Sequence, residues 1–173
     1  VVFFSEPIIE DFGPLARGFD QFGIFKEFIS GLDTERSLKL ILKPHPRETS
    51  QYWNDLILEE CFPEEISVHS SKLPTKSLLV QADAVIGITT SVLLEAFLLG
   101  IPILSIQVGR TGIVNPVIDE ITEPVLCSSE LKRRIKLLLQ KKQQVKNVNP
   151  QFQKLLQSND SRFLDAIERL VAN

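Results

Sequence analysis

The chain is poor in the residues that build disulfide frameworks and metal centres. Its 173 residues include two cysteines and two histidines, and no methionine. Cys61 and Cys127 are too few to form a disulfide framework, and neither a CxxC nor an HxxxH pattern is present. The sequence therefore predicts a domain that holds no metal and belongs to a reducing cytoplasm.

Long apolar runs are missing as well. No run approaches the roughly 18 residues that a membrane span requires, and the N-terminus lacks the charged-then-apolar pattern of a signal peptide. Hydrophobic residues still make up 43% of the chain, enough for one core. We expect a single domain over 1–173, and an opening on VVFFS without methionine is typical of a domain taken from a longer protein.

Positive charge is scarce before residue 130 and plentiful after it. From Glu130 onward there are ten Lys and Arg against four Asp and Glu; the totals of 19 and 22 leave nine against eighteen before it. The two parts therefore carry +6 and −9. A solvated helix face accounts best for the cluster at 132–146. The alternative is contact with anionic lipid or a partner, which would make the protein peripheral to a membrane.

What the sequence does contain is a regular alternation of strand-like and helix-like segments. Strands are expected at 1–5, 38–43, 66–70, 84–88, 101–106 and 124–128. Helices are expected at 20–31, 51–60, 74–82, 91–99 and from about 129 to 145, with two more helical pieces after Pro150 and Asp160. This order predicts a Rossmann-like three-layer α/β/α domain with a parallel sheet of about six strands.

Ligands of such sheets bind at the carboxyl ends of the strands. This rule directs attention to the polar segments that follow the strands. They are 5–7, 43–47, 69–72, 87–91 and 107–112, and they include both histidines of the chain.

The segment KPHPR at 43–47 has the chemistry of an anion site. His45 lies between Pro44 and Pro46, which restrict the backbone, so its imidazole can donate a hydrogen bond at low entropic cost. Lys43 and Arg47 add positive potential beside it. A proline-rich loop that merely ends a strand accounts for these residues equally well.

The segment GITTS at 87–91 precedes a predicted helix. Gly87 permits a tight turn, and Thr89, Thr90 and Ser91 place three hydroxyls where a helix offers free N–H groups and its positive dipole end. One hydroxyl alone would be a helix cap. Three in a row after glycine favour a phosphate site.

Glu95 is unusual because its neighbours from Val92 to Leu99 are otherwise apolar, which predicts a buried helix. A buried carboxylate needs a partner. The spacing does not fit a capping box, but it stacks Glu95 on the face of Ser91, and helical side chains lean toward the N-terminus. The two hydroxyls of a ribose would be a natural partner.

Taken together, LKPHPRE and the later ADAVIGITTSVLLEAFLLGIPILS resemble the C-terminal, nucleotide-sugar-binding domain of GT-B glycosyltransferases. The similarity is to bacterial capsule and polysialyltransferase-type enzymes and to CDP-glycerol glycerophosphotransferases. His45–Pro46 matches the His-Pro motif of those enzymes, and Thr90–Ser91 matches their Ser/Thr pair; both motifs contact the donor phosphates. Glu95–Ala96 matches a Glu-Ala helix whose glutamate grips the donor ribose.

The resemblance implies a donor-binding domain for a CMP-, CDP- or UDP-linked sugar or glycerol phosphate in surface polysaccharide synthesis. It implies no further cofactor, no nucleic-acid partner, and an N-terminal acceptor domain that is missing here, so the isolated chain is expected to be inactive. The expected site comprises Lys43, His45, Arg47, Gly87, Thr89, Thr90, Ser91 and Glu95, with His45 in the catalytic role.

Two other functions remain open. One is a nucleotide-sugar epimerase-like domain of related fold, and the other is a non-catalytic α/β interaction module. A dehydrogenase is disfavoured because no GxGxxG follows VVFFS. A receiver-type signalling domain is disfavoured because no paired acidic residues follow the first strand in the required context.

Overall fold

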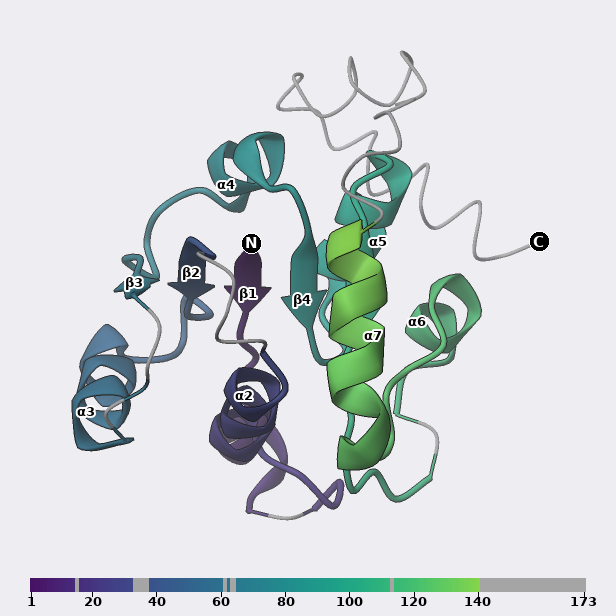
Figure 1. The fold of residues 1–173 in the computed structure, drawn as a ribbon. Coiled ribbons are helices and arrows are strands. Elements are labelled where there is room, and N and C mark those ends of the chain that lie inside the picture. Colours follow the sequence, from purple (N-terminus) through teal and green to yellow (C-terminus); the bar gives the residue numbers. More distant parts are fainter. Residues whose placement is uncertain (15, 33–37, 61, 63–64, 113, 141–173) are drawn as a thin grey trace.

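A computed structural model describes residues 1–14, 16–32, 38–60, 62, 65–112 and 114–140. Its centre is a five-stranded, all-parallel sheet in the order β3-β2-β1-β4-β5 (Figure 1). The strands are β1 (Val2–Phe4), β2 (Leu40–Lys43), β3 (Ile66–Val68), β4 (Val85–Gly87) and β5 (Ile103–Ser105). The predicted parallel α/β fold is thus confirmed.

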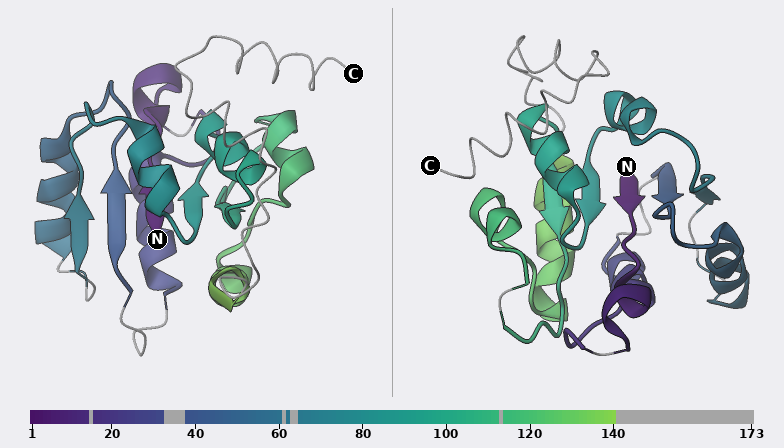
Figure 2. Two further views of the ribbon diagram at one scale, coloured as in Figure 1. Left: turned by 90° about the horizontal axis from the view of Figure 1, so that it is seen from above. Right: turned by 180° about the vertical axis from the view of Figure 1, so that it is seen from behind.

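Helices lie on both faces of this sheet (Figure 2). They are α1 (Ile8–Phe12), α2 (Gln21–Ser30), α3 (Ser50–Glu60), α4 (Thr75–Gln81), α5 (Ser91–Leu98), α6 (Pro116–Ile121) and α7 (Ser128–Gln140). Because successive strand residues point to opposite faces, β1 contributes to two cores. Phe3 packs with residues of α1, α2, α3 and α7, whereas Val2 and Phe4 pack with residues of α4, α5 and α6.

The prediction of a sixth strand at 124–128 is wrong. Only Val125 pairs there, in an isolated parallel bridge with Ile106 beside β5. Its N–H donates to the carbonyl of Ser105 and its carbonyl accepts from Gln107. Pro124 has no N–H to extend the ladder, and α7 already begins at Ser128, so the segment has room for one pair only.

The expected helices between 20 and 99 are present, with ends that differ by a residue or two. α2 begins where the Asp20 carboxylate accepts the Gly23 N–H at 2.7 Å, and α5 is followed by Gly100 in the left-handed region. The helix expected at 129–145 is seen as Ser128–Gln140. Its remainder, and the pieces expected after Pro150 and Asp160, lie outside the described residues.

Two short helices were not predicted. α1 has five residues and α6 six, too few to show a helical period. Gln21, at the start of α2, holds α1 through both ends of its amide, accepting from the Ile9 N–H and donating to Glu10. The Asn115 side chain caps α6 by accepting from Val117 and Ile118.

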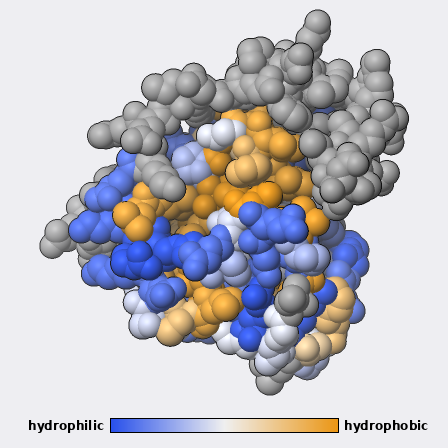
Figure 3. Space-filling model, turned by 90° about the vertical axis from the view of Figure 1, so that its right-hand side faces the viewer, coloured by the Kyte–Doolittle hydropathy of each residue, from blue (hydrophilic) through white to orange (hydrophobic). Residues whose placement is uncertain are grey.

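Apolar side chains also gather on part of the face shown in Figure 3, next to a band of hydrophilic ones. A groove of about 650 Å³ is lined by Phe97, Ile121 and Leu137, from α5, α6 and α7, together with Arg133 and Arg134. Within the described part of the chain, no helix has the length and apolar character needed to cross a membrane.

Candidate functional site at the carboxyl edge of the sheet

Two of the polar segments selected from the sequence flank the end of the central strand. β1 pairs with β2 on one side and with β4 on the other, so the segments 43–48 and 87–91 flank its carboxyl end. The strand order reverses between β1 and β4, which is where open α/β sheets bind ligands. Ser5 and Glu6 follow β1 and lie between the two flanking loops in strand order.

On the β2 side, the loop holds His45 in one orientation. The His45 N–H donates to Oε2 of Glu48 at 2.7 Å, and the His45 carbonyl accepts from the Glu48 N–H at 2.9 Å. The Arg47 N–H donates to Nδ1 of the imidazole at 3.2 Å. The neutral ring therefore carries its proton on Nε2, and no described residue accepts from that N–H.

Burial, and then the charge of Arg47, lowers the pKa of His45. The imidazole is accordingly neutral near pH 7 and able to donate from Nε2. This state suits a hydrogen bond to an anion, although it adds no full charge of its own.

Glu48 anchors this loop from the inside. Its side chain is buried and its Oε1 accepts from the Ser5 hydroxyl at 2.9 Å, which ties the loop to the end of β1. Burial raises the pKa of Glu48 to about 7, although the hydrogen bonds from His45 and Ser5 oppose this shift.

The two cations of this loop both have partners inside the protein. Lys43 is buried and its Nζ donates to the carbonyls of Ser71, at 2.7 Å, and Pro44, at 3.2 Å; burial lowers its pKa. The exposed Arg47 guanidinium forms a two-pronged ion pair with Asp11 of α1. Lys43 is therefore directed at backbone carbonyls, and Arg47 at a surface carboxylate.

On the β4 side, the chain turns tightly into α5. A Cβ on Gly87 would lie 2.9 Å from Cγ2 of Thr90 and 3.4 Å from the carbonyl oxygen of Phe4, so glycine lets the turn fold back over the strand. Thr90 is the N-cap residue, and its hydroxyl accepts from the Val92 N–H at 3.3 Å. Ser91, the first helical residue, is exposed.

The donors of Thr89 are occupied by Glu6. The Glu6 carboxylate accepts both the Thr89 N–H and, at 2.6 Å, the Thr89 hydroxyl. Burial raises the pKa of Glu6, while the hydrogen bonds from Thr89 and Thr90 and the charge of Arg17 act in the opposite direction. A carboxylate of the protein itself thus lies where the sequence predicts a bound anion.

Glu95 is half-buried on α5, and no hydrogen bond to its carboxylate comes from another described residue. Burial raises its pKa, against the attraction of Lys76 near the start of α4. The sequence predicts a helix that is buried on all sides, but α5 is not, because Phe97 is 47% exposed. Leu93 of this helix packs in the core, whereas Phe97 lines the groove described above.

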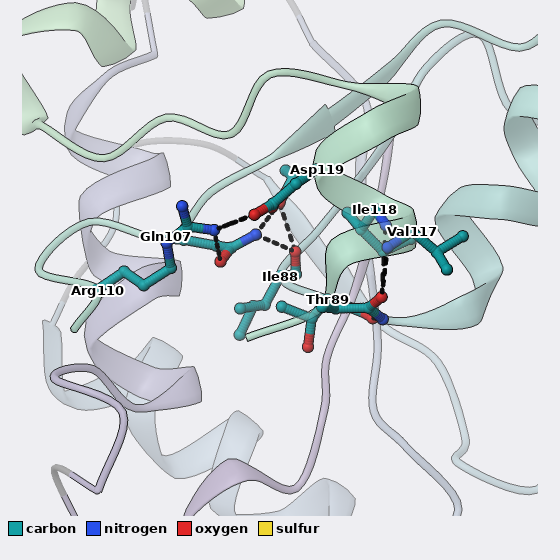
Figure 4. A network of polar contacts seen from close by, with 9 residues as sticks. Ile88, Thr89, Gln107, Arg110, Val117, Ile118 and Asp119 are labelled. Atoms are coloured by element: carbon teal, nitrogen blue, oxygen red, sulfur yellow. Dashed lines mark hydrogen bonds and ion pairs between the residues drawn. The ribbon is translucent and has the colours of Figure 1, made fainter. Parts of the chain in front are cut away.

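A buried polar network supports the β4 side from behind (Figure 4). The Ser105 hydroxyl donates to the Ile88 carbonyl at 2.5 Å, and the Gln107 amide donates to the Ser105 hydroxyl at 2.8 Å. Arg110 then bridges the Gln107 side chain and Asp119 of α6, at 3.1 and 2.7 Å. Arg110, which follows β5, is therefore a structural link.

The N-cap residue of α6 also contacts the 87–91 segment directly. The Asn115 amide donates to the Thr89 carbonyl at 3.0 Å, so the cap of α6 also holds the backbone before α5. Together these contacts set the conformation of the loop before any ligand arrives.

His45 thus lies in the loop on the β2 side of β1, and Thr89, Thr90 and Ser91 lie at the start of α5 on the β4 side. Sequence reasoning did not identify Glu6 and Glu48, the two carboxylates that organise these loops. Each acidic residue follows a buried strand within a few positions, and this signal could have identified both. In the described part of the chain, no group of three or more His, Cys, Asp or Glu side chains is arranged to hold a metal ion.

The fold and this edge define a parallel α/β domain with two polar loops beside its central strand. No protein-family model matches the chain, and no curated protein or solved structure is significantly similar to it.

Proposed function

We propose that this chain is the donor-binding domain of a transferase that uses a nucleotide-activated sugar or glycerol phosphate in surface polysaccharide synthesis. In this proposal it is one half of a GT-B fold, with three layers. A second domain would bind the acceptor and supply the catalytic base, so the isolated chain would bind nucleotide and transfer nothing.

One observation carries the proposal. The imidazole of His45 is held with Nδ1 accepting from the Arg47 N–H, so that Nε2–H is left to donate, in the loop on one side of β1. The hydroxyls of Thr90 and Ser91 begin α5 on the other side. A diphosphate lying across the end of β1 would be contacted from both loops, which is the arrangement that the motif resemblance implies.

The expected roles follow from the chemistry of each group. His45 would donate to an oxygen of the departing phosphate and stabilise the charge that develops there. The start of α5 would share this task through the hydroxyls of Thr90 and Ser91. Glu95, one turn further along, would accept from the ribose hydroxyls. Lys43 and Arg47 would add positive potential without direct contact.

The basic cluster gives a further element of the proposal. Lys132, Arg133 and Lys136 are exposed on α7, whose apolar face is already buried against the sheet. Contact of 132–146 with an anionic membrane surface at the cytoplasmic side would therefore be electrostatic and sensitive to salt. Residues 141–146 lie outside the described part of the chain.

A second candidate, a non-catalytic interaction module, is favoured by a different observation. Lys43, Arg47 and Thr89 already have internal partners, as a purely structural edge would require. Such a module would bind no nucleotide. An epimerase-like domain would bind nucleotide sugars as well, and only an assay with the complete protein would separate it from a transferase.

The test is calorimetric titration of the 173-residue chain with CMP, CDP, UDP and GDP, together with melting curves, since a ligand specific for the folded state raises the melting temperature. We expect at least one nucleotide to bind. His45→Ala should weaken that binding about ten- to a hundredfold, because a hydrogen bond to a charged group is worth roughly 1.5–3 kcal/mol.

His69→Ala is the matched control, since it removes the other imidazole of this edge, after β3. It should change affinity little. If none of the four nucleotides binds, or if His45→Ala binds as well as the native chain, the proposal is wrong.

A further inference from the structure

Glu6 stands out because it puts a negative charge on the donors that a phosphate at α5 would need. Its two carboxylate oxygens accept the N–H and the hydroxyl of Thr89, and Thr90 contributes a backbone hydrogen bond. These contacts join residues 83 positions apart, so they are a feature of the tertiary structure and not a local turn.

The surroundings of Glu6 do not neutralise it fully. Arg17, in the segment between α1 and α2, is the cation that acts on it, and the Arg17 guanidinium lies over the Phe12 ring, 3.6 Å from its centre. The other charged or titratable groups around this edge include Lys43, His45, Arg47 and Glu48 after β2, Glu10 and Asp11 in α1, and Glu95 in α5. Burial already favours the protonated form of Glu6 by raising its pKa.

We propose that Glu6 is a specificity-determining residue that takes up one proton when a phosphate group binds at the start of α5. This inference rests on the nucleotide-binding function proposed above. The proton comes from the solvent and is bound by a carboxylate oxygen of Glu6. The resulting acid donates it in a hydrogen bond to a phosphate oxygen, while its other oxygen continues to accept from Thr89.

The physical reason is the repulsion between two anions that share one set of donors. An ionised Glu6 and a phosphate at the same donors would repel each other, which weakens binding of the phosphate. A protonated Glu6 removes this repulsion and donates a hydrogen bond to the phosphate instead. The carboxylate therefore discriminates by charge. A neutral ligand in the same cleft requires no proton, and an anionic ligand does.

The experiment is calorimetric titration of CDP, and of cytidine as a neutral probe, into the full 173-residue chain at pH 8 and pH 9. Each titration is repeated in buffers of low and high ionisation enthalpy, so that the number of protons taken up can be read directly. At these pH values the second ionisation of a phosphate, near pH 6, is complete. His45, with its lowered pKa, and Glu48, with a pKa of about 7, are then deprotonated as well.

Glu6→Gln is the diagnostic variant. Its amide can still accept from the Thr89 N–H and can donate to the Thr89 hydroxyl, so the loop keeps its contacts without the charge. Glu10→Gln is the control, because it removes an exposed carboxylate of neighbouring α1. Melting curves of both variants establish that they fold.

We expect the native chain and Glu10→Gln to take up close to one proton per CDP, and their affinity to fall about tenfold from pH 8 to pH 9. Glu6→Gln should take up none, bind CDP more tightly than the native chain at pH 8, and show no dependence on pH. Cytidine should bind all three proteins without proton uptake.

If CDP binds the native chain with no proton uptake, or Glu6→Gln binds CDP more weakly than the native chain, Glu6 is a structural carboxylate and the inference is wrong, while the nucleotide-binding function stands. If CDP binds none of the three proteins and the other nucleotides also fail, the proposed function and this inference fall together.

Discussion

The two loops beside β1 are each held by one carboxylate, but they differ in which hydrogen-bond donors that carboxylate occupies. On the β2 side, Glu48 accepts one backbone N–H, from His45, and one hydroxyl, from Ser5. On the β4 side, Glu6 accepts the N–H and the hydroxyl of Thr89. Each loop is thus tied to the end of the central strand by one carboxylate.

The difference lies in what remains available. Glu48 takes the backbone N–H of His45 but leaves the imidazole Nε2–H without a partner among the described residues, whereas Glu6 takes the donors of Thr89 themselves. A row of donors at the start of a helix is therefore not equivalent to an empty anion site. The protein can supply the anion itself, and the sequence alone does not show whether it does.

The largest effect is expected for Glu48, whose pKa is raised from 4.5 to about 7. Between these values the folded state keeps a proton that the unfolded state has lost, so the free energy of unfolding falls as pH rises. At about 1.36 kcal/mol per pKa unit, the loss is about 3 kcal/mol. Urea unfolding from pH 4.5 to pH 8 should show this fall, and in Glu48→Gln the fall should be smaller by about the same amount.

In the control Glu123→Gln, which removes a carboxylate that is 84% exposed, the same fall should remain. An equal pH dependence in the native chain and in Glu48→Gln would mean that burial of Glu48 is not its cause.

The next largest effect concerns Glu95, which lies on the β4 side of the edge. If its carboxylate accepts from a ribose, a ribonucleotide should bind about ten- to a hundredfold more tightly than its 2′-deoxy counterpart. In Glu95→Gln this preference should shrink while the melting temperature is kept. Calorimetry of both nucleotides against both proteins measures it. Lower stability with an unchanged ribose preference would instead assign Glu95 to a structural role beside Lys76.

A smaller effect is expected when one hydroxyl is removed from either carboxylate. Ser5→Ala and Thr89→Val should each lower the free energy of unfolding at pH 8 by about 1.5 kcal/mol, because each removes a hydrogen bond that the protein donates to a carboxyl group, that of Glu48 or Glu6. Ser5→Ala should also raise the pKa of Glu48 further, which carboxyl NMR titration can follow. A pKa of Glu48 that stays the same or falls in Ser5→Ala would contradict the bonding described here.

The smallest effect is expected at the surface pair of Asp11 and Arg47. Exposed ion pairs contribute little to stability, so Asp11→Asn should leave the melting temperature almost unchanged. Asp11 favours the charged form of His45, so its loss should move the pKa of His45 slightly further down. NMR titration of the imidazole tests this. A large loss of stability would show that the pair holds α1 in place.

The sequence by itself determined the alternation of strands and helices, the parallel sheet, and the placing of the polar loops at one edge. These follow from local signals, namely apolar runs, the Asp20 cap, and glycine or proline at element ends, which act within a few residues. The prediction of a strand around Val125 was wrong, because one proline limited the pairing to a single bridge. The helices α1 and α6 were not predicted, because they are too short to show a helical period.

Only the tertiary structure decided which side chains form hydrogen bonds with one another at the carboxyl edge of the sheet. The contact of Glu6 with Thr89 spans 83 positions and that of Ser5 with Glu48 spans 43, so no local pattern contains them. They form because strands adjacent in the sheet are distant in the chain, and because a carboxylate buried at their ends must find donors there. The sequence placed the polar side chains at this edge, and the order of the strands determined which of them would be satisfied within the protein and which would face a ligand.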